Sequence, residues 1–197
     1  MKKIFLGIAV SVLCLSGTVF GKNLPNVKIL AVGGTIAGVA STQEQSTSYK
    51  AGQLTVQTLI ESVPAMKKLA RITGEQYCNI GSGNLTDNDI LGLAKRVDSV
   101  LKAPETDAVV ITHGTDTLEE TAWLLNLTVH SDKPIVLVGA MRPATAISAD
   151  GPANLLNAVR CAASEEAIGQ GALIVMNEEI HNARDVTKTD TTVSYTH

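Results

Sequence analysis

Short apolar runs without alternating polar residues recur along this chain, and they are separated by segments with helical spacing of apolar residues. The runs predict strands over residues 27–32, 107–112, 134–140 and 171–176. A strand that is apolar at every position is buried on both faces, as in a parallel sheet covered by helices. We therefore expect an α/β fold with a mainly parallel sheet, helices on both of its faces, and three layers.

Three helices are predicted, over residues 86–101, from Thr117 onward, and over residues 154–167. Thr86 and Asp89 have the spacing of a capping box, in which two side chains bond the free backbone N–H groups of a helix start. Thr117 and Glu120 have the same spacing, so we expect a capping box at the start of the second helix as well.

Charge and composition argue against several classes of partner. The chain has 16 Lys and Arg against 19 Asp and Glu, a net charge of −3, so neither a nucleic acid nor a membrane partner is expected. Aromatic residues make up 3% of the chain, too few for a base-stacking surface. No Cys/His cluster has metal-ligand spacing, and we expect neither a metal nor another cofactor.

The first 21 residues have the pattern of a cleaved signal peptide. Lys2 and Lys3 precede an apolar run over residues 4–15, which is too short to span a membrane, and small residues lie before Gly21. We therefore expect a domain over residues 24–197 and a periplasmic or secreted protein.

Four residues with reactive or aromatic side chains are expected to be structural. Cys78 lies in a predicted strand and Cys161 on the apolar side of a predicted helix, so both are expected to be buried free thiols. Trp123 is expected to pack in the core or against a helix. His113 has the residue type of a general base, but a single His at a strand end is more often structural.

Polar residues follow the predicted strands, where parallel sheets bind their ligands. Thr35 lies in Gly-Gly-Thr-Ile-Ala-Gly (residues 33–38), a setting that leaves its hydroxyl uncrowded and suits a nucleophile. A threonine that caps a turn is the alternative. The glycine spacing does not match a dinucleotide-binding fingerprint.

Similar residues follow the later runs. Thr115 and Asp116 precede a predicted helix, where they either hold a ligand or cap the helix. The backbone at Ala140 is suited to face a substrate amide. Lys188 lies in a polar loop, where a solvated charge is the ordinary interpretation.

Four segments together resemble the bacterial type II L-asparaginases. They cover residues 33–38, 111–117, 138–143 and 185–188, and the resemblance extends over residues 24–192. It implies a flavodoxin-like domain that hydrolyses L-asparagine to L-aspartate and ammonia, with L-glutamine as a possible second substrate. It also implies a homotetramer for the full-length protein.

The resemblance assigns catalytic roles to five matched residues. Thr35 matches the nucleophile, and Tyr49 matches a lid tyrosine beside it. Thr115 matches a second threonine, paired with Lys188, and Asp116 matches the carboxylate that holds the substrate α-amino group. We expect Lys188, Thr115 and Asp116 to share protons as one coupled unit.

The resemblance also implies four substrate-binding positions. Ser82 matches the residue that holds the α-carboxylate, Ala140 matches a backbone site near the side-chain amide, and Gly34 belongs to the same substrate-binding set. Gly83 stands where many relatives have Gln, which favours asparagine over glutamine. The polar segment over residues 43–48 suits a lid.

The chain also differs from the resembled family at its end. Those proteins continue for well over a hundred residues into a second domain, which supplies an acidic residue to a neighbouring active site. A truncated, inactive amino-acid-binding domain or pseudoenzyme is therefore an alternative. A flavodoxin-like nucleotide-binding protein is a third hypothesis, but the glycine spacing does not fit it.

Overall fold

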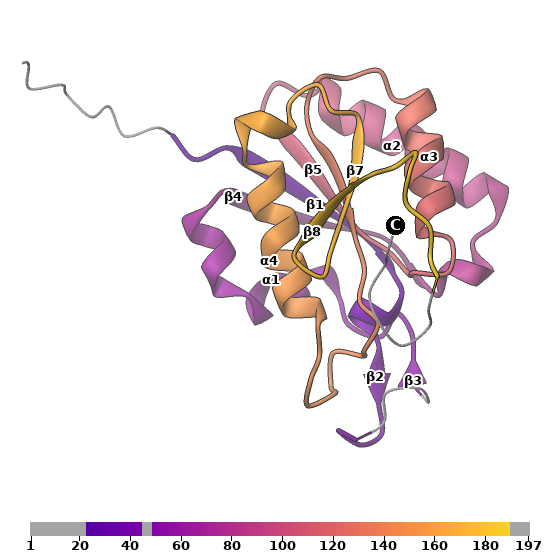
Figure 1. The fold of residues 1–197 in the computed structure, drawn as a ribbon. Coiled ribbons are helices and arrows are strands. Elements are labelled where there is room, and N and C mark those ends of the chain that lie inside the picture. Colours follow the sequence, from indigo (N-terminus) through magenta and orange to yellow (C-terminus); the bar gives the residue numbers. More distant parts are fainter. Residues whose placement is uncertain (1–22, 45–48, 190–197) are drawn as a thin grey trace, which may run out of the picture.

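The computed structural model describes residues 23–44 and 49–189. A six-stranded sheet forms its centre (Figure 1). In sheet order the strands are β4 (Arg71–Ile80), β1 (Asn26–Gly33), β5 (Ala108–Thr112), β6 (Ile135–Val138), β7 (Ala172–Met176) and β8 (Glu179–Asn182). The first five are parallel and β8 is antiparallel to β7, so the predicted mainly parallel α/β sheet is confirmed.

The four predicted strands correspond to β1, β5, β6 and β7, and the last three are buried at every position. The predicted run to residue 140 ends earlier, because β6 stops at Val138 and the chain turns at Gly139. Strands β4 and β8 lie at the two ends of the sheet, where half-exposed, mixed sequences replace the apolar runs.

Helices cover both faces of the sheet, which gives the expected three layers. On one face α1 (Val56–Ser62) and α4 (Gly151–Ala162) pack over one apolar core. On the other face α2 (Asp87–Lys102) and α3 (Leu118–Thr128) pack over a second core. Consecutive residues of β1 alternate between them, with Ile29 in the first core and Leu30 in the second. Figure 1 shows these two helix pairs on opposite sides of the sheet.

The two predicted capping boxes have different outcomes. The box at the start of α2 is present: the backbone N–H of Asp89 donates to Thr86 Oγ1, and the backbone N–H of Thr86 donates to Asp89 Oδ2. The box at the start of α3 is absent, because the side chain of Thr117 makes no cap. Instead, Thr117 Oγ1 donates to the backbone carbonyl of Ser82 at 3.1 Å.

The bounds predicted for the third helix were also wrong. Helix α4 begins at Gly151, with a proline in its first turn, and it ends at Ala162. A separate 3-10 turn (Glu165–Ala167) follows, and Ser164 caps it by accepting a hydrogen bond from Glu166.

Cys78 and Cys161 are free thiols, as expected, but only one of them is buried. Cys161 is buried in α4, whereas Cys78 in β4 is half-buried and its thiol donates to the carbonyl of Val32 at 3.1 Å. Trp123 is 37% exposed, so it does not lie in the core; its packing against a helix, the other expectation, stays a prediction. It follows Ala122, whose side chain belongs to the buried stripe of α3, and one step along a helix turns a side chain away from that stripe.

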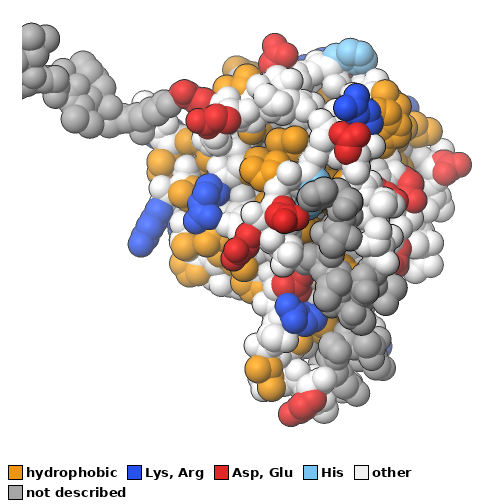
Figure 2. Space-filling view, in the orientation of Figure 1, with side chains coloured by type: hydrophobic (Ala, Val, Ile, Leu, Met, Phe, Trp, Pro, Cys, Tyr) orange, Lys and Arg blue, Asp and Glu red, His pale blue; other side chains and the backbone are white. Residues whose placement is uncertain are grey.

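Some expectations fall outside the described residues. The predicted signal peptide lies in residues 1–22, and part of the segment expected to form a lid lies in residues 45–48. Within the described ranges, the helices are all too short or too polar to cross a membrane. Figure 2 shows acidic and basic side chains spread among neutral ones over the described part of this face, some of them side by side.

Candidate active site

The loops that follow β1 and β5 touch at two glycines. Gly34 has a φ of +80°, and a Cβ at this position would lie 2.3 Å from the Cα of Gly114. Only glycine accommodates both that backbone conformation and that approach. The contact brings together the loops that carry Thr35 and Thr115, whose side chains are both buried.

Tyr49 reaches Thr35 from a two-stranded hairpin. Strands β2 (Val39–Ala40) and β3 (Tyr49–Lys50) pair antiparallel, with Ala40 opposite Tyr49. The hydroxyl oxygens of Thr35 and Tyr49 lie 2.5 Å apart and share a hydrogen bond. The hairpin is also tied to the loop after β6, because the backbone N–H of Ala40 donates to Thr145 Oγ1 at 2.9 Å.

Lys188 lies against the second hydroxyl and is not a solvated loop charge. Its Nζ donates to Thr115 Oγ1 at 3.1 Å and to Asp116 Oδ1 at 2.6 Å. The side chain of Lys188 is 18% exposed and that of Asp116 is 69% exposed, so the ion pair lies at the mouth of the site. The structure therefore brings together the three residues that were expected to act as a unit.

Ser82 begins a 3-10 turn (Ser82–Asn84) after β4, and its hydroxyl bonds the two residues that lead into α3. Its Oγ accepts from the backbone N–H of Asp116 at 3.1 Å and from that of Thr117 at 3.4 Å. A Cβ on Gly114 would lie 2.6 Å from Ser82 Oγ, so the absence of a side chain at residue 114 permits this close approach. The hydroxyl proton of Ser82 remains to be donated elsewhere.

Gly83 lies beside the outer carboxylate oxygen of Asp116. A Cβ at residue 83 would have Asp116 Oδ2, 3.8 Å away, as its only heavy-atom neighbour within 4 Å among the described residues. A Cβ at residue 83 would therefore make an ordinary van der Waals contact with Asp116 and no clash.

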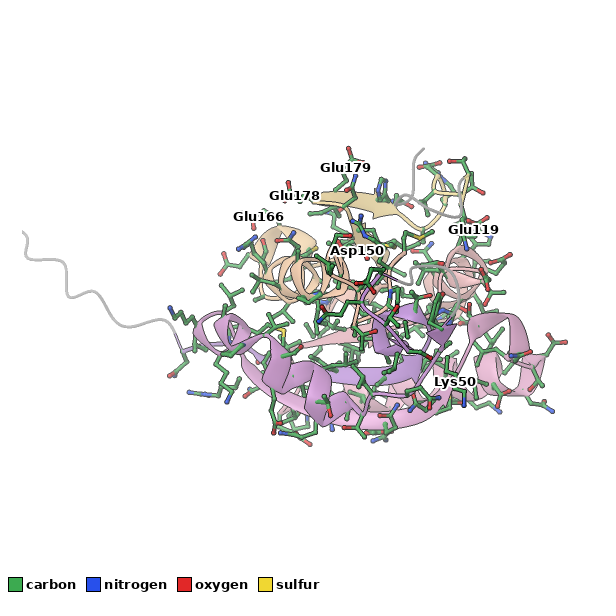
Figure 3. The ribbon with its side chains drawn as sticks, turned by 90° about the horizontal axis from the view of Figure 1, so that it is seen from below. Lys50, Glu119, Asp150, Glu166, Glu178 and Glu179 are labelled. Atoms are coloured by element: carbon green, nitrogen blue, oxygen red, sulfur yellow. The ribbon has the colours of Figure 1, made fainter. Side chains whose placement is uncertain are left out.

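Ala140 is fully buried in the turn after β6, and two residues of the α4 start hold this turn. The two carboxylate oxygens of Asp150 accept from the backbone N–H groups of Met141 and Arg142, both at 2.9 Å. Asn154 Nδ2 donates to the carbonyl of Gly139 at 3.1 Å. In Figure 3, Asp150 lies toward the middle of the molecule, whereas Glu166 lies at its edge.

Asp150 and Asn154 were not identified from the sequence as part of the site. The signal available was Asp-Gly-Pro at residues 150–152, which is typical of a helix start and does not indicate where the carboxylate bonds.

His113 is a buried structural residue beside the site. Its Nδ1 lies 2.7 Å from the carbonyl of Gly114, and its Nε2 lies 3.1 Å from Thr121 Oγ1. Burial lowers the pKa of His113 to about 4, so the ring is neutral at pH 7. No group of three or more His, Cys, Asp and Glu that could hold a metal ion occurs within residues 23–44 and 49–189.

The site contains two buried threonine hydroxyls. Thr35 is hydrogen-bonded to the phenol of Tyr49, and Thr115 is hydrogen-bonded to the amine of Lys188. Hydroxyls in such settings can act as nucleophiles or relay protons. Buried backbone N–H groups in glycine-containing turns can stabilise a developing oxyanion.

Comparisons with known proteins identify the relatives of this chain. The sequence model of a family described as "Asparaginase, N-terminal" matches residues 26–196. The chain is 57% identical over 175 residues to an L-asparaginase 2 of Bacillus subtilis, covering 89% of this chain and 47% of that protein. It is 57% identical over 174 residues to a probable periplasmic L-asparaginase of Haemophilus influenzae, covering 88% and 49%. The chain spans about half the length of these curated relatives.

A solved structure has the same fold. It is that of a probable cytoplasmic L-asparaginase from Campylobacter jejuni, with a TM-score of 0.83 and 50% sequence identity. The match covers 85% of this chain and 51% of that one.

Proposed function

This chain belongs to the asparaginase family, and on that premise we propose that it hydrolyses L-asparagine to L-aspartate and ammonia with Thr35 as the nucleophile. The observation that carries the proposal is the pair of buried hydroxyls, with Thr35 bonded to Tyr49 at 2.5 Å and Thr115 bonded to Lys188 at 3.1 Å. The pair lies beyond the carboxyl ends of parallel strands, where such sheets bind ligands.

In the first half of the reaction, Thr35 Oγ1 attacks the side-chain amide carbon of the substrate. A bond forms between Oγ1 and carbon, and the hydroxyl proton leaves by way of Tyr49, whose hydroxyl is within hydrogen-bond distance. The tetrahedral oxyanion is stabilised by backbone N–H groups in the turns around Gly34 and Ala140. The C–N bond then breaks, and ammonia leaves with a proton returned to it.

In the second half, water hydrolyses the threonine ester. A water molecule loses a proton to the unit formed by Lys188, Thr115 and Asp116, and its oxygen attacks the ester carbon. The bond between Thr35 Oγ1 and carbon breaks, Thr35 recovers its proton, and L-aspartate is released. The contacts of Lys188 Nζ with both partners support this assignment.

The substrate backbone would bind between Ser82 and Asp116. Ser82 Oγ already accepts two backbone hydrogen bonds, so its proton is suited to a carboxylate. Asp116 uses Oδ1 to bind Lys188, while Oδ2 lies on the side of Gly83 and is suited to an α-ammonium group.

Gly83 is the basis of a proposed preference for asparagine over glutamine. The space above it lacks a side-chain amide that would help hold a longer substrate at the α-carboxylate end. One relative, from Acinetobacter glutaminasificans, is named a glutaminase-asparaginase and is 53% identical over 163 residues, which keeps both substrates within the proposal.

Export and assembly complete the proposal. The Lys-rich, apolar start of the sequence supports a cleaved signal peptide and a periplasmic or secreted protein. A homotetramer is proposed for the full-length protein. The alternative is a noncatalytic amino-acid-binding domain that retains Ser82 and Asp116, and the share of its relatives that this chain spans favours testing it.

The test is ammonia release from L-asparagine by the purified chain. Thr35→Ala is the critical variant, and Thr128→Ala, at an exposed position in α3, is the matched control. Ammonia from the wild type and from Thr128→Ala, but not from Thr35→Ala, supports hydrolysis through Thr35. A folded wild-type sample that binds L-aspartate and releases no ammonia supports the binding domain instead.

A further inference from the structure

Glu119, in the first turn of α3, holds the segment that carries Lys188. Its Oε1 accepts from Thr187 Oγ1 at 2.7 Å, and its Oε2 accepts from the backbone N–H of Lys188. One carboxylate therefore receives two hydrogen bonds from consecutive residues that lie 68 and 69 positions further along the chain. Figure 3 shows Glu119 on α3.

This contact bears directly on where the Lys188 amine lies. Lys188 has a long, flexible side chain, and fixing its own backbone nitrogen limits the positions that Nζ can reach. Before Lys188 the chain is held at Val186, which is buried in the same core as α2 and α3, and at Thr187, which forms an isolated β-bridge. Glu119 provides the anchor at Lys188 itself, and it belongs to α3, the helix that Thr115 and Asp116 closely precede.

The charge of Glu119 also suits its place. A carboxylate in the first turn of a helix is stabilised by the helix dipole, and hydrogen bonds to a charged acceptor are stronger than those to a neutral one. The N-terminal end of α3 thus stabilises the carboxylate of Glu119, which holds Lys188. The two residues that Lys188 contacts lie just before the same helix end.

We propose that Glu119 is a positioning residue that fixes Lys188 Nζ between Thr115 and Asp116. The catalytic consequence rests on the proposed function, but the positioning itself does not. Glu119 is not expected to touch the substrate, since both of its carboxylate oxygens bond to residues of this chain.

The first experiment measures positioning without measuring activity. Trypsin cleaves after Lys188 only when this segment opens, and intact mass detects the loss of residues 189–197. Glu119→Ala is expected to accelerate this cleavage by about tenfold or more, because two hydrogen bonds to a charged group are lost. Glu119→Gln keeps one acceptor for Thr187, so its cleavage rate after Lys188 is expected to lie between those of the wild type and Glu119→Ala. Cleavage after Lys50 is the internal reference.

Glu120→Ala is the matched control, since it removes the same charge from the next residue of the helix, which is exposed. Its cleavage rate after Lys188 should stay within about twofold of the wild type. Equal rates in Glu119→Ala and the wild type, or equal acceleration in both alanine variants, would overturn the proposal.

The second experiment uses ammonia release. Glu119→Ala is expected to lower kcat about tenfold or more while KM changes less than about twofold, and to have no further effect in a Lys188→Ala background. Additive losses in the double variant would contradict positioning through Lys188. A wild-type chain that releases no ammonia argues against the proposed function, while the proteolysis result still decides the role of Glu119.

Discussion

Ser82 Oγ accepts a hydrogen bond from the backbone N–H of Asp116 at 3.1 Å, across 34 residues of sequence. A serine just after β4 therefore holds the segment that leads into α3, a helix whose own Thr117 provides no side-chain cap. The same hydroxyl thus holds the entry to the helix and lies at the place proposed for the substrate carboxylate.

Replacing Ser82 by Ala should therefore have two effects. The free energy of unfolding should fall by about 1 kcal/mol, the usual net value of a hydrogen bond within a protein, as measured by urea denaturation. Binding of L-aspartate should also weaken, as measured by calorimetry. Ser62→Ala, at the end of α1, is the control and should change stability by less than about 0.5 kcal/mol. Unchanged values for Ser82→Ala would refute both roles.

Gly83→Gln should raise the ratio of glutamine to asparagine turnover by about tenfold. The added side chain would start 3.8 Å from Asp116 Oδ2 without a clash at its Cβ, and its amide would lie where it can hold the backbone end of a longer substrate. Ammonia release from the two amides, measured as kcat/KM, gives the ratio. Gly83→Leu, of similar size and without an amide, should not raise it, and an equal rise in both variants would make side-chain volume the cause.

Stability should depend on pH through His113. Burial lowers its folded pKa to about 4 from 6.5, so the unfolded state takes up a proton in this interval and the folded state does not. The free energy of unfolding is therefore not reduced by His113 above about pH 6.5. As the pH falls toward 4, it decreases by up to about 3 kcal/mol because the unfolded state binds a proton that the buried ring does not. Unfolding free energies at pH 7 and 4.5 should differ less in His113→Gln than in the wild type. His130→Gln, at an exposed position, should keep the wild-type difference.

The turn between β7 and β8 predicts a stabilising substitution. Asn177 and Glu178 have φ values of 53° and 65°, and a two-residue hairpin turn of this kind favours Asn followed by Gly. Glu178→Gly should raise the free energy of unfolding by about 0.5–1 kcal/mol, because a side chain at positive φ is strained. Thermal unfolding measures the gain. Glu179→Gly, one residue later in β8, should destabilise, and a lower melting temperature in Glu178→Gly would disprove the argument.

The strands that could be predicted from the sequence are those with both faces covered. Each position of β5, β6 and β7 is buried, so an apolar run marks each of them. Strand β4, predicted only around Cys78, has no such run, because it lies at the end of the sheet and exposes residues such as Arg71 and Gln76. Its Glu75 instead forms a two-point ion pair with Arg96 of α2, both distances 2.7 Å, which lowers the pKa of that carboxyl.

The candidate site was predictable only in part for a related reason. Topology alone places Thr35 and Thr115 near each other, because parallel strands end at one edge of the sheet. The contact of Lys188 with Thr115 spans 73 residues and has no local pattern, so only the resemblance to a family suggested it. Glu119, Asp150 and Asn154 act through backbone atoms of other segments, which a residue pattern does not encode.

The meeting of Gly34 with Gly114 restricts how this site can change during evolution. Most packing contacts can drift in pairs, because a larger residue on one side is offset by a smaller one on the other. Here both partners are already the smallest residue, and a Cβ at residue 34 would lie 2.3 Å from the opposing Cα. No second substitution can restore that space. A larger residue at position 34 is therefore tolerated only if the backbone of the loop also changes.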